Sequence, residues 1–127
     1  MNWRIRAILL FMAASLSTIF FLFTSPNVFA QTRPAVHWTT FNKQASQCAC
    51  HLFALDAMRS EGLNQVFEDT GTIILAGNNQ VIAETICLPG NRQIRLSAFS
   101  SDSATAERVR NNVRAEIVRS GLIDTCP

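Results

Sequence analysis

Beyond residue 30 the chain lacks the motifs that usually disclose a catalytic activity. It has only two histidines, His37 and His51, no Gly-x-Ser-x-Gly elbow and no glycine-rich phosphate loop. The carboxylates Glu68, Asp69 and Glu84 do not form a recognisable general acid–base pair. These absences argue against the common hydrolase and nucleotide-binding classes, and we expect no catalytic residue and no cofactor.

The chain also lacks a net positive charge once its first thirty residues are set aside. It holds 11 basic and 9 acidic residues, and Arg4 and Arg6 lie in those thirty, so nine of each sign remain. The arginines near the C-terminus share their segment with Glu107 and Glu116, and no aromatic residue lies between them. We therefore expect no nucleic acid as the partner, and no anionic membrane surface.

The first thirty residues have the layout of a leader. Two arginines and no acid precede an apolar run over residues 7–23, and Val28 and Ala30 form a small-residue cleavage pattern. This layout predicts a signal peptide over residues 1–30 and one small domain over residues 31–127, secreted or periplasmic. The alternative is an uncleaved leader that anchors the domain to a membrane through residues 7–23, close to the lower length limit for a spanning helix.

The hydrophobic pattern predicts an α+β fold. We expect helices over residues 41–61 and 103–120, strands over 72–76, 80–88 and 92–99, and an additional edge strand over 35–40. Residues 63–71 are expected to connect, with Val66 and Phe67 turned toward the core. The short turns favour a two-layer arrangement: a three- or four-stranded antiparallel sheet with both helices on one face.

Four cysteines in an exported domain of this size predict disulfide bonds. Cys48 and Cys50 are two positions apart on the first predicted helix, so their side chains point about 200° apart and each needs a different partner. Cys50 lies on the apolar face of that helix, and Cys87 ends a strand on the face that points at it. We therefore favour Cys50–Cys87, with Cys48–Cys126 pinning the tail.

The segment Cys48-Ala49-Cys50-His51 supports a second hypothesis, a metal-binding or redox-active module. It resembles a haem attachment site, but that site needs Cys-x-x-Cys-His, and here the cysteines are one residue too close. Convergence of Cys48, Cys50 and His51 on a metal is incompatible with a regular helix. Disulfide bonding remains the leading interpretation, and no metal ligand is assigned.

Strand alternation places Ile82, Ile86 and Phe99 on the face of the sheet that points away from the helices. Exposed apolar clusters often mark contact surfaces, so these three residues are the candidate site. The alternative is that the N-terminal segment with Trp38 folds over them.

Several features together resemble small exported proteins, common in cyanobacteria, that have a helix–three-strand meander–helix domain and no assigned activity. The features are Cys50 with Ala54 and Ala57, Gly62-Leu63, Ile86-Cys87, and Ser101-Asp102 before an arginine-rich last helix. The resemblance implies the fold and export only. We expect a non-enzymatic binding or accessory protein at the cell envelope, with a protein, a small ligand or a second copy of the chain as partner; a small hydrolase without a visible motif is a further alternative.

Overall fold

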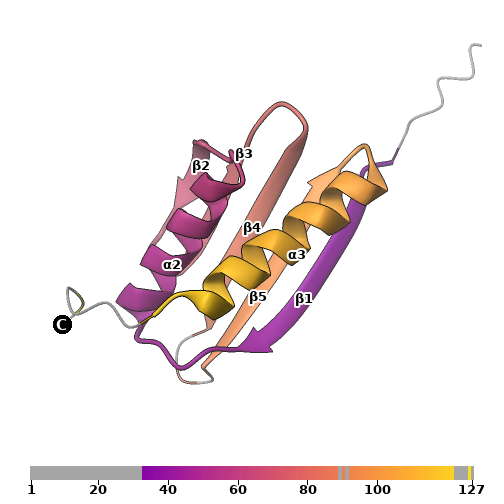
Figure 1. The fold of residues 1–127 in the computed structure, drawn as a ribbon. Coiled ribbons are helices and arrows are strands. Elements are labelled where there is room, and N and C mark those ends of the chain that lie inside the picture. Colours follow the sequence, from indigo (N-terminus) through magenta and orange to yellow (C-terminus); the bar gives the residue numbers. More distant parts are fainter. Residues whose placement is uncertain (1–32, 89, 91, 122–125, 127) are drawn as a thin grey trace, which may run out of the picture. The chain divides into compact units, whose positions relative to one another are not determined.

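An open, five-stranded antiparallel sheet forms one layer of the protein, and two helices form the other (Figure 1). The computed structural model describes residues 33–88, 90, 92–121 and 126; the predicted signal peptide lies outside them. The sheet order is β1-β5-β4-β3-β2. The strands are β1 (Ala35–Asn42), β2 (Gln65–Asp69), β3 (Ile73–Gly77), β4 (Val81–Leu88) and β5 (Gln93–Ser100), and the helices are α2 (Gln47–Ser60) and α3 (Ser103–Arg119).

Both helices lie on the same face of the sheet, as the sequence predicts (Figure 1). Helix α2 packs against β3 and β4, and α3 packs against β1, β5 and β4. Each begins at a capping side chain: Ser46 Oγ accepts from the Ala49 N–H at 3.1 Å, and Asp102 Oδ2 accepts from the Thr105 N–H at 2.9 Å. Neither helix has the length and apolarity needed to cross a membrane, and the described residues form no other helix.

The predicted start of the first helix is wrong. Phe41 and Asn42 belong to β1, where they pair with Ile94 and Gln93 of β5. Phe41 is buried because it continues the inward alternation of β1, so burial of this aromatic ring extends the strand past the expected helix start. The helix begins later, with Ser46 as its N-cap.

The predicted strand count is also wrong, because the expected connection over residues 63–71 contains β2. This short strand pairs with β3, with a bulge between Val66 and Glu68. Val66 and Phe67 are exposed rather than turned into the core. Since β2 is an edge strand and neither helix packs closely on it, the side chains have no layer in which to be buried.

The core lies between the helices and the inner face of the sheet. Every residue that strand alternation assigns to this face on β4 and β5 is buried, as predicted: Val81, Ala83, Thr85, Cys87, Ile94, Leu96 and Ala98. The helices contribute buried stripes that include Cys50, Ala54, Ala57 and Met58 from α2, and Ala106, Val109, Val113 and Ile117 from α3. The alanines let the helices approach the strands closely.

Gly77, at the end of β3, is required for a reason other than the positive φ that a tight hairpin suggests. Its φ is not positive; instead, a Cβ atom at this position would lie 2.7 Å from the carbonyl oxygen of Val81. The turn itself is held by Asn78, whose side-chain oxygen accepts from the N–H groups of Gln80 at 2.9 Å and Val81 at 3.1 Å. Close approach of the backbone therefore selects the glycine.

Two disulfides are present, and one of them joins the two layers. Cys50 of α2 bonds Cys87 of β4, with a Cα–Cα distance of 6.1 Å, and both residues are buried. Cys48 bonds Cys126, with a Cα–Cα distance of 5.6 Å, and so ties the C-terminal segment to α2. These are the two bonds favoured from the sequence, where the helical spacing requires different partners and the apolar face of the helix points Cys50 at Cys87.

Candidate functional site

The face of the sheet opposite the helices, here called the open face, has an apolar row that crosses four strands. The register places Gly77 of β3 beside Ile82 of β4, Ile82 beside Phe99 of β5, and Phe99 beside Val36 of β1. At the β2 edge, Phe67 continues the row, because its ring approaches within 3.1 Å of the position that a Gly77 Cβ would occupy. Val36 and Phe67 are about half exposed, and Ile82 is 38% exposed.

The next row of the open face carries the most exposed aromatic residue of the described part of the chain. The register aligns Leu75, Glu84, Ser97 and Trp38 across β3, β4, β5 and β1. Trp38 is 66% exposed. Its indole is an extended apolar surface with one polar N–H, a combination that is enriched at protein–protein contacts.

The three predicted contact residues, Ile82, Ile86 and Phe99, all point to the open face, because their strand neighbours on either side are buried in the core. Ile82 is exposed, whereas Ile86 and Phe99 are partly buried by their neighbours. The alternative that the segment with Trp38 folds over them is wrong. Strand β1 lies beside β5 within the sheet, so Trp38 enlarges the open face instead of covering it.

The open face is hollowed in two places. A hollow of about 250 Å³ is lined by Val36, Trp38, Glu84, Arg95 and Ser97. A second, of about 530 Å³, lies at the end of the face beyond the apolar row and includes Ile82 and Phe99 in its lining. Both are shallow features of one surface and could accept projecting side chains from a partner.

Glu84 and Arg95 are the charges in the middle of the open face. Glu84 pairs with Ser97, and Arg95 pairs with Ile86 two positions away, so the two charges are diagonal neighbours on adjacent strands. The ion pairs found among the described residues involve other side chains. The central strands of the open face therefore present one acid and one base that are available to a partner, and Glu68, which pairs with Leu75, adds a second acid at the β2 edge.

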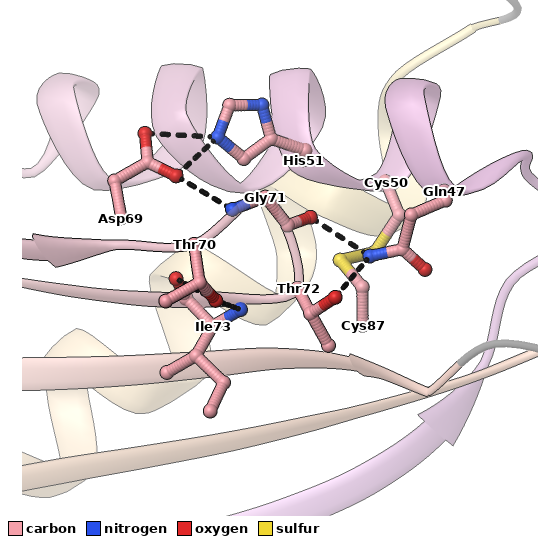
Figure 2. A network of polar contacts seen from close by, with 9 residues as sticks. All are labelled: Gln47, Cys50, His51, Asp69, Thr70, Gly71, Thr72, Ile73 and Cys87. Atoms are coloured by element: carbon pink, nitrogen blue, oxygen red, sulfur yellow. Dashed lines mark hydrogen bonds and ion pairs between the residues drawn. A yellow bond between two sulfur atoms is a disulfide. The ribbon is translucent and has the colours of Figure 1, made fainter.

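On the other side of the molecule, His51 forms part of a polar network that ties α2 to the turn between β2 and β3 (Figure 2). The His51 Nε2 atom lies 2.8 Å and 2.9 Å from the two carboxylate oxygens of Asp69. Asp69 also accepts from the Gly71 N–H at 3.0 Å, and Gln47 Nε2 donates to the Gly71 carbonyl oxygen at 2.8 Å. The Thr72 carbonyl oxygen completes the attachment by accepting from the Cys87 N–H at 2.8 Å.

The same contacts hold the pKa of the Asp69 carboxyl below its usual value. The largest cause is the hydrogen bond from the Gly71 N–H, partial desolvation opposes it, and the hydrogen bond and charge of His51 act in the same direction as Gly71. Asp69 is thus an ionised acceptor in the network, and its contacts fasten the β2–β3 turn.

Cys48, Cys50 and His51 do not converge on a common point. Cys48 and Cys50 are in different disulfides, and His51 is engaged by Asp69. Within the described residues, no group of three histidine, cysteine, aspartate or glutamate side chains is placed to hold a metal ion. The two thiols that a Cys-Cys-His metal site would require are both consumed by disulfide bonds.

His37 makes a contact that the sequence does not suggest. Its Nε2 atom lies 2.9 Å from Ser103 Oγ at the start of α3. A serine–histidine pair is a component of some nucleophilic sites, but such sites also need a group that orients the histidine. No described side chain is hydrogen-bonded to the other ring nitrogen of His37, so the contact is best explained as a link between β1 and α3.

A third hollow, of about 390 Å³, lies beside the buried disulfide and includes Lys43, Gln47, Cys50 and Arg92 in its lining. The Lys43 ammonium is already used inside the fold, since it donates to the carbonyl oxygens of Val118 at 3.0 Å and Ser120 at 2.6 Å. These contacts satisfy the C-terminal end of α3.

Sequence reasoning missed Val36, Trp38, Phe67 and Leu75 as members of the open face. The alternation in residues 35–40 was the available signal, because it already implies that Val36 and Trp38 share one face of an edge strand.

No protein-family model matches the chain, and no curated protein is significantly similar to it.

Proposed function

We propose that this protein is an exported, non-enzymatic binding domain that uses the open face to dock on another protein molecule. The observation that carries the proposal is the apolar row Phe67, Ile82, Phe99 and Val36, with Trp38 in the next row, on the side of the sheet that neither α2 nor α3 covers. In a sheet with one solvated face, the residues that point to the solvent are usually polar. The residues of this row and Trp38 point to the solvent and are apolar. Large exposed apolar patches of this kind mark interaction sites.

Export is supported by the leader layout and by the use of the cysteines. All four cysteines are paired in disulfides, a state that persists in oxidising compartments and is rare in the cytosol. The binding role, rather than catalysis, is supported by the placement of His37 and His51, each of which is engaged in a link between layers. The resemblance to small exported proteins of the cyanobacterial type agrees with this proposal.

Site-specific photo-crosslinking tests the proposal. The full chain is expressed in a bacterium that exports it, with benzoylphenylalanine at position 38 and, in a second variant, at position 82. The matched control places the same residue at Val118, which is also apolar and 48% exposed but lies on α3, away from the open face. We expect covalent adducts from positions 38 and 82 and none from position 118.

An adduct whose mass exceeds that of one chain supports docking on the open face, whatever the partner. If neither position 38 nor position 82 gives an adduct while the variants are exported and disulfide-bonded, the open face has no protein partner and the proposal is wrong. Equal labelling from position 118 would show unspecific contact and would also overturn it.

A further inference from the structure

Four strands of the sheet are arranged symmetrically about the line between β4 and β5, with β3 outside β4 and β1 outside β5. The rows of the open face run straight across this line: Ile82 pairs with Phe99, and Glu84 pairs with Ser97. A two-fold axis parallel to the strands along this line would exchange β4 with β5 and β3 with β1 while leaving each row in place. In such an arrangement the face is laid against an equivalent copy of itself.

We infer that the occupant of the open face is a second copy of this chain, packed face to face about that axis. This inference rests on the proposed function, because it names the partner of the same surface. Ile82 of one copy then lies over Phe99 of the other, and Leu75 lies over Trp38, each contact occurring twice. Two sheets packed in this way form a sandwich whose strand directions differ by about 30° because of sheet twist.

The charges on the face fit the same symmetry. Across the axis, Glu84 of one copy lies over Ser97 of the other and next to its Arg95, and the reverse pair forms on the other side. The central acid and base of each copy therefore neutralise those of the other, while Glu68 lies on β2, outside the four strands that the axis exchanges. An anionic membrane or a nucleic acid would require several cations, and Arg95 is the one cation in the middle rows of the face.

The dimensions of the face are sufficient for such a pair. With about 4.8 Å between strands and about 3.3 Å per residue, the eight-residue and five-residue strands cover about 500 Å² of flat sheet in each copy. Two copies would bury about 1,000 Å² in total, the lower limit for a specific interface. We therefore expect a dimer that dissociates at micromolar concentration rather than an obligate one.

Sedimentation equilibrium of the purified exported chain tests the inference. We expect a concentration-dependent monomer–dimer equilibrium, together with a blue shift of Trp38 fluorescence as the dimer forms, because the indole leaves water. Ile82→Glu should weaken the dimer at least tenfold, because it places a carboxylate in the apolar row. The control Val118→Glu should leave the equilibrium unchanged, since Val118 lies on α3.

A charge exchange tests the position of the axis. Glu84→Arg gives each copy two cations at the middle of the face, and Arg95→Glu gives each copy two anions, so each variant alone should dimerise about tenfold more weakly. Mixing the two variants in equal amounts should restore association to within about twofold of the wild type, because opposite charges then meet. Variants with a damaged fold would not regain association when they are mixed, so the recovery distinguishes a charge effect from misfolding.

The outcomes separate this inference from the proposed function. A wild-type chain that stays monomeric up to several hundred micromolar, or charge variants that dimerise as tightly as the wild type, would overturn the second copy as partner. A crosslink from position 38 to a different protein would also overturn it, while leaving the open face as a docking site. If neither position 38 nor position 82 forms a crosslink, both the proposed function and the second copy as partner are contradicted.

Discussion

The two faces of the sheet are built from the same strands, yet they satisfy opposite requirements. On β4 and β5 the inner positions hold small and branched residues such as Ala83, Ala98 and Leu96, and all are sealed by the helices. The outer positions of the same strands hold Ile82 and Phe99, with Trp38 on the adjacent strand, and no described element covers them. The inner face is thus covered by α2 and α3, whereas the apolar groups of the open face remain in contact with water in the described part of the chain.

The difference shows that apolar character alone does not define a core. A side chain on the inner face contributes to folding because it makes van der Waals contacts both with neighbouring strands and with the helix packed over it. An outer position of equal hydrophobicity contributes little to folding but retains its capacity to bury area on association. Substitutions on the two faces should therefore separate stability from binding.

The largest expected effect is on the inner face. Leu96→Ala should lower the free energy of unfolding by about 3 kcal/mol, because Leu96 is fully buried and its loss leaves a cavity between β5 and the helices. Ile82→Ala, on the open face, should lower it by less than about 1 kcal/mol in dilute monomer. Urea denaturation of both variants measures the contrast; equal losses would show that the open face is already covered in the monomer.

A smaller effect of opposite sign is expected at Thr85. Its hydroxyl is fully buried on the inner face and has no hydrogen-bond partner among the described residues. Thr85→Val keeps the shape and removes the unsatisfied group, so it should raise the free energy of unfolding by about 1 kcal/mol. Thermal denaturation at several protein concentrations provides the measurement, and a destabilised variant would show that the hydroxyl is satisfied in the folded protein.

The smallest expected effect is the acid dependence contributed by Asp69, which attaches α2 to the β2–β3 turn. Its pKa is lowered in the folded chain, so its contribution is present above about pH 4 and is lost as the pH falls through the folded pKa. Asp69→Asn should therefore be less stable than the wild type at about pH 6, and the difference should shrink as the pH falls through the folded pKa of Asp69. A difference that persists in acid would assign the effect to packing rather than charge.

Local patterns predicted much of the fold because they depend on short-range chemistry. The periodic stripes located both helices, although the predicted first helix began too early, and the alternation in β4 and β5 identified their inward residues correctly. The disulfide pairing could be favoured from sequence because Cys48 and Cys50 cannot point the same way on a helix. The errors at Phe41 and at Val66-Phe67 arose where strand pairing with a distant segment overrode the local pattern.

The candidate surface was only partly predictable for the same reason. Ile82, Ile86 and Phe99 follow from alternation within two strands, but the place of Trp38 depends on whether β1 pairs with β5 or folds over it. That choice is made by backbone hydrogen bonds between residues about sixty positions apart, and no local pattern encodes it.

Residue periodicity and cysteine spacing were enough to predict an α+β domain with both helices on one face of the sheet and two disulfides that start from the first helix. The fifth strand and the position of Trp38 beside Ser97, one row from Phe99, emerged only from the folded sheet. Helical and alternating patterns reflect contacts between near neighbours in the chain, whereas a surface is assembled from strands that are distant in sequence and adjacent only after pairing.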